Sequence, residues 1–247
     1  MKRFTTQGAC MKETTKTKLK NVSTATLATA LYKRGLRNQI IQGVAPLAEL
    51  KGASMVGTAF TLRYIPARED LNPLSVFRDH GHPQRRAIEE CPPGCVLVMD
   101  SRKDPRAASA GSILATRLMV RGVAGMVTDG GFRDSAEIAA LDMPAFHSRP
   151  SAPTNLTLHQ AIDIDVPIGC GDAPVFPRDV VVGDKDGVIV IPAGLADEIA
   201  DEAVEMTAYE DFVTERVRAG QKIFGLYPAT DDANLREFAQ WRARNGR

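Results

Sequence analysis

Cysteine, histidine and tryptophan are scarce in this chain of 247 residues, which has four cysteines, four histidines and one tryptophan. Four cysteines do not make the disulfide framework of a small secreted domain, and a chain of this length buries a core that needs no such support. Three residues separate Cys91 from Cys95, which have no second cysteine pair, and His80 and His82 offer too few ligands. Folding is therefore expected to need neither a disulfide nor a structural metal.

Long hydrophobic runs are also absent. No stretch reaches the roughly 18 apolar residues of a membrane-spanning helix. No charged and then apolar leader marks the sequence as secreted. These absences predict a cytoplasmic protein with no membrane span.

The chain also has no large excess of positive or negative charge, because its formal net charge is +1. Residues 1–20 hold six Lys or Arg and one acidic residue, Glu13, so the other 227 residues carry a net charge of −4. The body of the chain thus gives no positive support for nucleic-acid binding. We expect residues 1–20 to form a disordered basic tail, with contact to nucleic acid as the alternative.

The middle third of the sequence alternates short apolar strands with helices. The expected elements are a strand over 95–99, a helix over 110–120, a strand over 123–128, a helix over 135–141 and a strand over 144–146. This alternation predicts an α/β fold with a mostly parallel sheet. Ligands bind beyond the carboxyl ends of such strands. Because Asp100 and the segment 129–134 both follow strands, we expect them to share a site.

The flanking regions predict further elements. Before the middle third, the sequence predicts a helix from Ser23 to about Lys33, a strand over 54–65, a functional loop over 66–83 and a helix over 84–90. After it come strands over 162–168, 180–182 and 188–191, a hairpin turn at 183–187, and helices over 193–218 and 234–243. We expect an α/β domain over 21–192, and C-terminal helices over 193–247 that pack on it or on a neighbouring subunit.

The segment Asp129-Gly-Gly-Phe-Arg-Asp134 has the chemistry of a ligand site. Its two glycines let the backbone approach a ligand closely. Arg133 offers a fork of donors for a carboxylate or an enolate oxygen, and Asp134 offers hard oxygen to Mg²⁺ or Mn²⁺. An exposed ion pair between Arg133 and Asp134 is the structural alternative.

The segment Gly111-Ser-Ile-Leu114 is a second candidate, because it begins a helix after a stretch of small residues. Free N–H groups and the positive end of the helix dipole make such a start a carboxylate site. Ser112 or Ser109 acting as a simple helix cap is the alternative.

A resemblance to a known family rests on several motifs. They are Val96-Leu-Val-Met-Asp100, Gly111-Ser-Ile-Leu-Ala115, Arg121-Gly-Val-Ala-Gly125, Thr128-Asp-Gly130, Arg133-Asp-Ser-Ala-Glu137 and Gly187-Val-Ile-Val-Ile-Pro192. With these motifs, about 170 residues from Thr24 to Pro192 resemble the family of 4-hydroxy-4-methyl-2-oxoglutarate aldolase and the regulator of ribonuclease E activity A. The resemblance implies a β/β/α swivelling-type domain (RraA-like), assembled as a homotrimer or hexamer with sites between subunits.

The resemblance also implies roles for individual residues. Asp134 would be the metal ligand for Mg²⁺ or Mn²⁺, and Arg133 would bind the keto acid and stabilise its enolate. Asp100 would orient a metal-bound water. The start of the helix at Gly111, with the amides of Ser112, Ile113 and Leu114, would hold the substrate carboxylate.

These roles imply a divalent-metal-dependent carbon–carbon lyase that releases pyruvate from a 4-hydroxy-2-keto acid, with oxaloacetate decarboxylation as a side activity. A metal-dependent hydrolase of a 2,4-dioxo acid and a non-catalytic regulator of ribonuclease E activity are the alternatives. Many family members have an acidic residue where this chain has Ser112, which leaves open a substrate that is not a dicarboxylate. Segments 63–86 and 220–247 have no secure family counterpart and are expected to set substrate choice or assembly.

Overall fold

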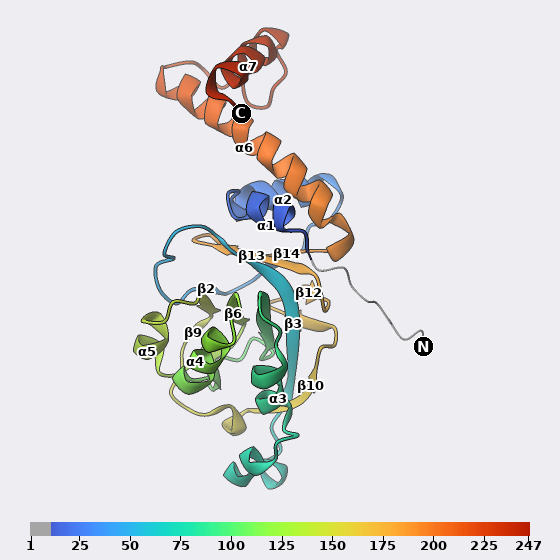
Figure 1. The fold of residues 1–247 in the computed structure, drawn as a ribbon, viewed down its shortest axis with the longest axis vertical. Coiled ribbons are helices and arrows are strands. Elements are labelled where there is room, and N and C mark those ends of the chain that lie inside the picture. The colour runs from blue at the N-terminus through green and yellow to red at the C-terminus, as the bar shows by residue number, and fades with distance from the viewer. Residues whose placement is uncertain (1–10) are drawn as a thin grey trace.

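The computed structural model describes residues 11–247 (Figure 1). Its helices are α1 (Glu13–Leu19), α2 (Thr24–Lys33), α3 (Pro83–Glu90), α4 (Ser112–Val120), α5 (Ser135–Ala139), α6 (Ala196–Arg218) and α7 (Asp232–Asn245). Its strands are β1 (Ile40–Ile41), β2 (Ala45–Pro46), β3 (Met55–Pro66), β4 (Cys95–Asp100), β5 (Ala108–Ala110), β6 (Gly125–Thr128), β7 (Gly131–Phe132), β8 (Ala145–His147), β9 (Arg149–Pro150), β10 (His159–Ile164), β11 (Ile168–Cys170), β12 (Ala173–Val175), β13 (Val180–Asp184) and β14 (Gly187–Ile191). The predicted α/β class is confirmed.

The main sheet within these residues has nine strands, in the order β1-β14-β13-β3-β4-β6-β8-β2, with β10 paired to β3. Only β3, β4, β6 and β8 pair in parallel, and the other pairs in this sheet are antiparallel. The prediction of a mostly parallel sheet is therefore wrong outside these four strands. The tight turn from Asp184 to Gly187 explains part of the difference, since a short hairpin can join only antiparallel strands.

The two faces of the sheet are covered by different elements. On one face, α3, α4 and α5 pack on the parallel strands, with Leu118 and Ile138 set against Leu97 and Met126. On the other face, the β11–β12 hairpin covers the sheet through residues such as Cys170 and packs in a second cluster. The strands β4 and β6 end between these two layers. Each side chain at their carboxyl ends therefore faces either the helices or the β11–β12 hairpin.

A third packed layer lies at the antiparallel end of the sheet. Figure 1 shows α1 and α2 between α6 and the strands β13 and β14. Ser23 begins α2, since its hydroxyl accepts a hydrogen bond from the Thr26 amide as the sequence predicts. Leu19, Leu27 and Ile199 of these helices are fully buried against the two strands. The N-terminal helices therefore belong to the core of the domain.

The predicted disordered tail is wrong for residues 11–20, while residues 1–10 lie outside the described part of the chain. Residues 13–19 form α1, because its apolar side chain Leu19 is buried in the core. Its basic residues pair with the acidic first turns of α6: Lys12 lies 2.6 Å from Asp197, and Lys18 pairs with Asp201. The charge pattern that suggested a solvated tail is explained by this pairing.

The second half of α6 and α7 form a C-terminal arm. This arm begins later than the predicted boundary at residue 193. The first half of α6 lies in the core with α1 and α2, through side chains such as Ile199. The second half of α6 and α7 form a separate small cluster around Phe212, Leu226 and Trp241. Figure 1 shows this arm projecting away from the sheet.

Two predicted elements are divided differently in the structure. The helix expected from residue 110 begins at Ser112, because residues 108–110 form β5. The strand expected over 162–168 is interrupted and becomes β10 and β11. Across residues 11–247, we found no helix that combines the length and hydrophobicity needed to span a membrane.

Substitution of Leu19 tests whether α1 belongs to the core. Leu19→Ala removes a fully buried side chain and should lower the free energy of unfolding by about 2–5 kcal/mol, measured by urea unfolding with circular dichroism. Leu74→Ala, where the side chain is 74% exposed, is the control and should change it by less than about 0.5 kcal/mol. Equal stability of Leu19→Ala and the unsubstituted protein would contradict the packing of α1.

Candidate functional site

Arg133 and Asp134 lie where the chain leaves β7 and enters α5. Asp134 has a left-handed backbone (φ 56°, ψ 45°), a conformation that costs an L-residue about 1 kcal/mol. Its Oδ2 accepts hydrogen bonds from the Ser112 amide at 3.0 Å and the Ser112 hydroxyl at 3.2 Å. The Nε atom of Arg133 lies 3.7 Å from the same oxygen. The pair is therefore tied to the first turn of α4 and remains accessible, with side chains 46% and 39% exposed.

Gly111 makes this close approach possible. A Cβ atom at position 111 would lie 2.7 Å from Asp134 Oδ2 and 2.8 Å from Arg133 Nε. The backbone of Gly111 is extended (φ −130°, ψ −178°), so a larger residue would not strain the backbone but would displace the Arg133 and Asp134 side chains from these positions. The predicted importance of the glycine that begins the helix thus has a direct steric reason.

The first turn of α4 has no side-chain cap. The Ser109 hydroxyl instead contacts the hydroxyls of Ser101 and Thr128, at 2.7 and 2.6 Å, and the Ser112 hydroxyl contacts Asp134. The alternative in which Ser112 or Ser109 caps the helix is therefore wrong. Because N–H groups in a first helical turn lack intrahelical acceptors, this end of α4 suits an anion.

A pocket of about 130 Å³ lies between α3, the start of α4 and the Arg133–Asp134 pair. The predicted residues that line it are Gly111, Ile113, Leu114, Arg133 and Asp134. Ser112 contacts Asp134 beside them. The structure thus brings the two sequence segments that were predicted as ligand sites to one pocket.

Asp129 belongs to the protein core and not to the pocket. Its carboxylate is 3% exposed and accepts hydrogen bonds from the amides of Ser101 (2.6 Å), Lys103 (3.0 Å) and Gly171 (3.1 Å). Burial raises the pKa of Asp129, and these amide hydrogen bonds oppose that effect. Its role is to join the loop after β4 to the turn after β11.

Gly130 and Gly131 also serve packing. A Cβ atom on Gly130 would lie 2.6 Å from the Cβ of Ser101, and one on Gly131 would lie 2.6 Å from the Cβ of Ser151. Neither glycine lines the pocket. The expectation that these glycines let the backbone approach a ligand is therefore wrong, because protein atoms fill that space.

Asp100 is not brought to the pocket, although it ends β4 as predicted. Side chains alternate between the faces of a strand. Leu97 and Met99 face the layer that contains α4, while Val96 and Val98 face the β11–β12 layer. Asp100 continues the second set, and burial raises the pKa of its carboxyl, while hydrogen bonds from the amides of Arg102 and Gly169 oppose that rise. The prediction that Asp100 shares a site with the segment 129–134 relied on the fact that both follow strands. It did not consider which face of the sheet the Asp100 side chain takes.

The pocket residues that the sequence analysis missed include Gln84, Arg85 and Asn155. Gln84 is buried and donates hydrogen bonds to the carbonyl of Ser109 at 2.8 Å and to Asn155 at 3.2 Å. These bonds join α3 to β5 across the pocket. A signal for them was present, since α3 directly follows the 66–83 loop that was predicted to be functional.

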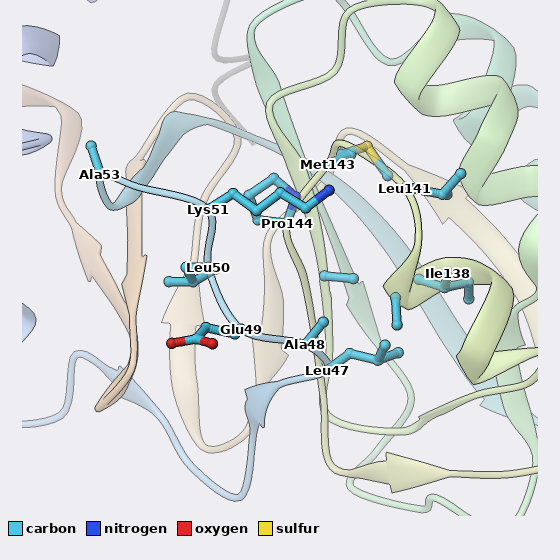
Figure 2. A pocket seen from close by; sticks show the side chains of 12 residues that line it. Leu47, Ala48, Glu49, Leu50, Lys51, Ala53, Ile138, Leu141, Met143 and Pro144 are labelled. Atoms are coloured by element: carbon cyan, nitrogen blue, oxygen red, sulfur yellow. The ribbon is translucent and has the colours of Figure 1, made fainter.

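Another cavity, of about 80 Å³, lies between the loop 47–53 and the segment 138–145 (Figure 2). Its lining is mainly aliphatic, and Figure 2 shows Glu49 pointing away from Met143 and Leu141. Glu49 pairs with Lys185 outside this lining, at 3.3 Å. Glu49 and Lys51 are the charged residues of this lining, whereas the Arg133 pocket combines a cation, an anion and the start of a helix, so it is the better candidate site.

Comparison with known proteins identifies the family. A family model described as "RraA-like: Aldolase/RraA" matches residues 24–190. The chain belongs to the RraA-like family. The matched region begins at α2 and ends in β14, so it includes every pocket residue and excludes the arm.

Several curated relatives carry aldolase names, including one from Halalkalibacterium halodurans and one from Thermus thermophilus. A Halalkalibacterium halodurans protein named "Putative 4-hydroxy-4-methyl-2-oxoglutarate aldolase" is 36% identical over 131 residues, which are 53% of this chain and 61% of that protein. The Thermus thermophilus 4-hydroxy-4-methyl-2-oxoglutarate aldolase is 29% identical over 119 residues, 48% of this chain and 71% of that protein. The chain thus spans about three fifths of the first relative.

A solved structure matches most of the chain. It is Streptomyces coelicolor RraAS2, described as an unusual member of the RNase ES inhibitor RraA protein family. The TM-score is 0.72 with 28% sequence identity, over 83% of this chain and 97% of that one. The RraA-like fold of this domain is therefore confirmed.

Substitutions of Asp134 measure the backbone strain at the site. Asp134→Gly and Asp134→Ala both lack the carboxylate, but only glycine adopts the left-handed backbone without strain. The free energy of unfolding should be about 1 kcal/mol higher for Asp134→Gly than for Asp134→Ala in urea denaturation. At Ala136, an exposed position in α5, substitution by glycine should lower it. The opposite order at Asp134 would contradict the described backbone.

Proposed function

We propose that the chain is a divalent-metal-dependent carbon–carbon lyase that releases pyruvate from a 4-hydroxy-2-keto acid, with oxaloacetate decarboxylation as a side activity. The observation that carries this proposal is one pocket that combines Arg133, Asp134 and the first turn of α4. The aldolase names of the two relatives support the same reaction class.

In this reaction, different protein groups bind the substrate carboxylate and stabilise the developing negative charge. The amides of Ile113 and Leu114, at the positive end of the α4 dipole, bind the carboxylate of the keto acid. The Arg133 guanidinium donates to the keto oxygen, where negative charge develops as the carbon–carbon bond breaks. Ser112 holds Asp134 beside this guanidinium through two hydrogen bonds, and Gly111 leaves the space for it. Binding and charge stabilisation thus come from two neighbouring segments.

The residues present fit a magnesium or manganese ion. Asp134 lines the pocket, and its Oδ1 receives no hydrogen bond from residues 11–247. Within the same residues, no three His, Cys, Asp or Glu side chains gather as a metal cluster. A cation held by one carboxylate and water suits Mg²⁺ or Mn²⁺ better than an all-protein cage. When bound, the ion supplies a Lewis acid for the developing charge.

The same pocket also suits a hydrolase of 2,4-dioxo acids, because that reaction releases the same pyruvate fragment and needs the same two charged groups. A regulatory role has separate support, since the solved relative from Streptomyces coelicolor is described within an RNase ES inhibitor family. A panel of substrates and an assay of ribonuclease E cleavage separate these alternatives.

We also propose a homotrimer or hexamer with sites between subunits. Asp134 is the one acidic side chain that lines the pocket among the described residues, so the proton of the C4 hydroxyl has no second carboxylate to receive it. Ile113 at the pocket is 80% exposed, which is unusual for a large apolar side chain beside a ligand site. A neighbouring subunit would cover Ile113 and complete the site.

Removal of the metal or of either charged side chain tests the lyase. With Mg²⁺ or Mn²⁺, the protein should form pyruvate from oxaloacetate or 4-hydroxy-4-methyl-2-oxoglutarate, followed with coupled lactate dehydrogenase. EDTA, Arg133→Ala and Asp134→Ala should each lower the rate at least about 100-fold, because each removes charge stabilisation. Lys185→Ala and Glu49→Ala, which separate an exposed ion pair outside the segment 63–86, are matched controls and should keep the rate.

Three outcomes would contradict the lyase. Full activity in EDTA would show that the reaction does not depend on a divalent metal. Pyruvate from 2,4-dioxo acids alone would favour the hydrolase. Failure to turn over any acid in the panel, together with inhibition of ribonuclease E cleavage, would favour the regulator.

Substitution of Ile113 tests the assembly. The purified protein should have the mass of a trimer or hexamer in light scattering after gel filtration, and Ile113→Asp should shift it toward the monomer, because a charge would be buried at the interface. Val120→Asp, at an exposed apolar position outside the segments 63–86 and 220–247, is the control. A monomeric mass for the unsubstituted protein would contradict the assembly.

A further inference from the structure

Arg85 is a cation without an acidic partner in the described part of the chain. It lines the Arg133 pocket and also a larger neighbouring hollow of about 660 Å³. Two other arginines of that hollow are neutralised: Arg86 lies 2.6 Å from Glu90, and Arg117 lies 2.8 Å from Glu89. No carboxylate within residues 11–247 pairs with Arg85.

The Arg85 side chain is held in place although it lacks an acidic partner. Its guanidinium lies over the ring of Phe77, 4.2 Å from the ring centre. The preceding residue, Gln84, anchors α3 through its hydrogen bonds to Ser109 and Asn155. Arg85 is half-buried, and burial lowers its pKa, to which the nearby charge of Arg133 adds. Arg85 thus adds a guanidinium without an acidic partner to a pocket that already contains Arg133, and an anion between the two would relieve their repulsion.

The pocket and the hollow are connected through shared lining. Phe77, Arg85, Ile113 and Leu114 line both. A keto acid whose reacting end contacts Arg133 would therefore extend past Arg85 as it leaves the pocket. This places Arg85 beside the end of the substrate that is remote from the keto group.

We propose that Arg85 is a specificity-determining residue that binds a second carboxylate at the remote end of the substrate. This inference rests on the proposed keto-acid site and adds the residue that would recognise the second carboxylate of such a substrate. The neutral Ser112 hydroxyl, which contacts Asp134, adds no negative charge to the pocket that would repel a dicarboxylate.

Two keto acids of equal chain length test the role of Arg85. 2-Oxoglutarate has the remote carboxylate, 2-oxopentanoate lacks it, and neither carries the C4 hydroxyl that cleavage requires. In isothermal titration calorimetry with Mg²⁺, the unsubstituted protein should bind 2-oxoglutarate at least about tenfold more tightly, as expected for a charge-assisted hydrogen bond. Arg85→Gln should remove this preference by weakening 2-oxoglutarate alone, and Arg85→Lys should retain part of it.

The control is Arg86→Gln, which alters the neighbouring paired arginine and should keep the preference. Circular dichroism should show the same unfolding midpoint for all variants. Equal affinity of the unsubstituted protein for both acids would overturn the role of Arg85 while leaving the keto-acid site intact. Equal weakening of both acids by Arg85→Gln would overturn it too, as a merely structural effect. Failure of both acids to bind would overturn the proposed function itself.

Discussion

A buried carboxylate organises the region in which the candidate site is built. Asp129 is almost inaccessible to water. Its carboxylate accepts hydrogen bonds from three backbone amides in two separate segments, the loop at Ser101–Lys103 and the turn at Gly171. An isolated buried charge would be costly, but a carboxylate that accepts several amide hydrogen bonds is tolerated. The end of β6 is thereby fixed relative to β4 and β11. Because β7, Arg133 and Asp134 follow within five residues, their position depends on this junction.

The site itself depends on space as much as on charge. Gly111 leaves no side chain between α4 and the Arg133–Asp134 pair, and the Ser112 amide then holds the aspartate. The backbone of Asp134 is left-handed at this position, a conformation that is strained for a residue other than glycine. One free helix terminus, one guanidinium and one carboxylate are thus concentrated in a small volume. Such an arrangement provides charge stabilisation without a large set of ligands.

The sequence predicted those parts of the site that are local in the chain. Arg133, Asp134 and the start of α4 follow from short motifs, because each motif folds largely on its own neighbours. Arg85 did not follow, since its place depends on how α3 packs against β5 through Gln84. Asp100 was misplaced because a strand end does not say which face a side chain takes. The burial of α1 was missed for a similar reason, as its lysines found partners on α6, far along the chain.

The separate cluster of the C-terminal arm has a consequence for spectroscopy. Trp241 is the single tryptophan of the chain, and it lies in that cluster, where its indole N–H donates to Glu215 at 2.7 Å. Its fluorescence therefore reports the local environment of the arm and not that of the sheet or the pocket. Cooperative units of a protein can open at different free energies. An unfolding curve from tryptophan emission would follow the arm, while circular dichroism follows the whole chain, and a difference between the two curves would measure how independently the arm folds.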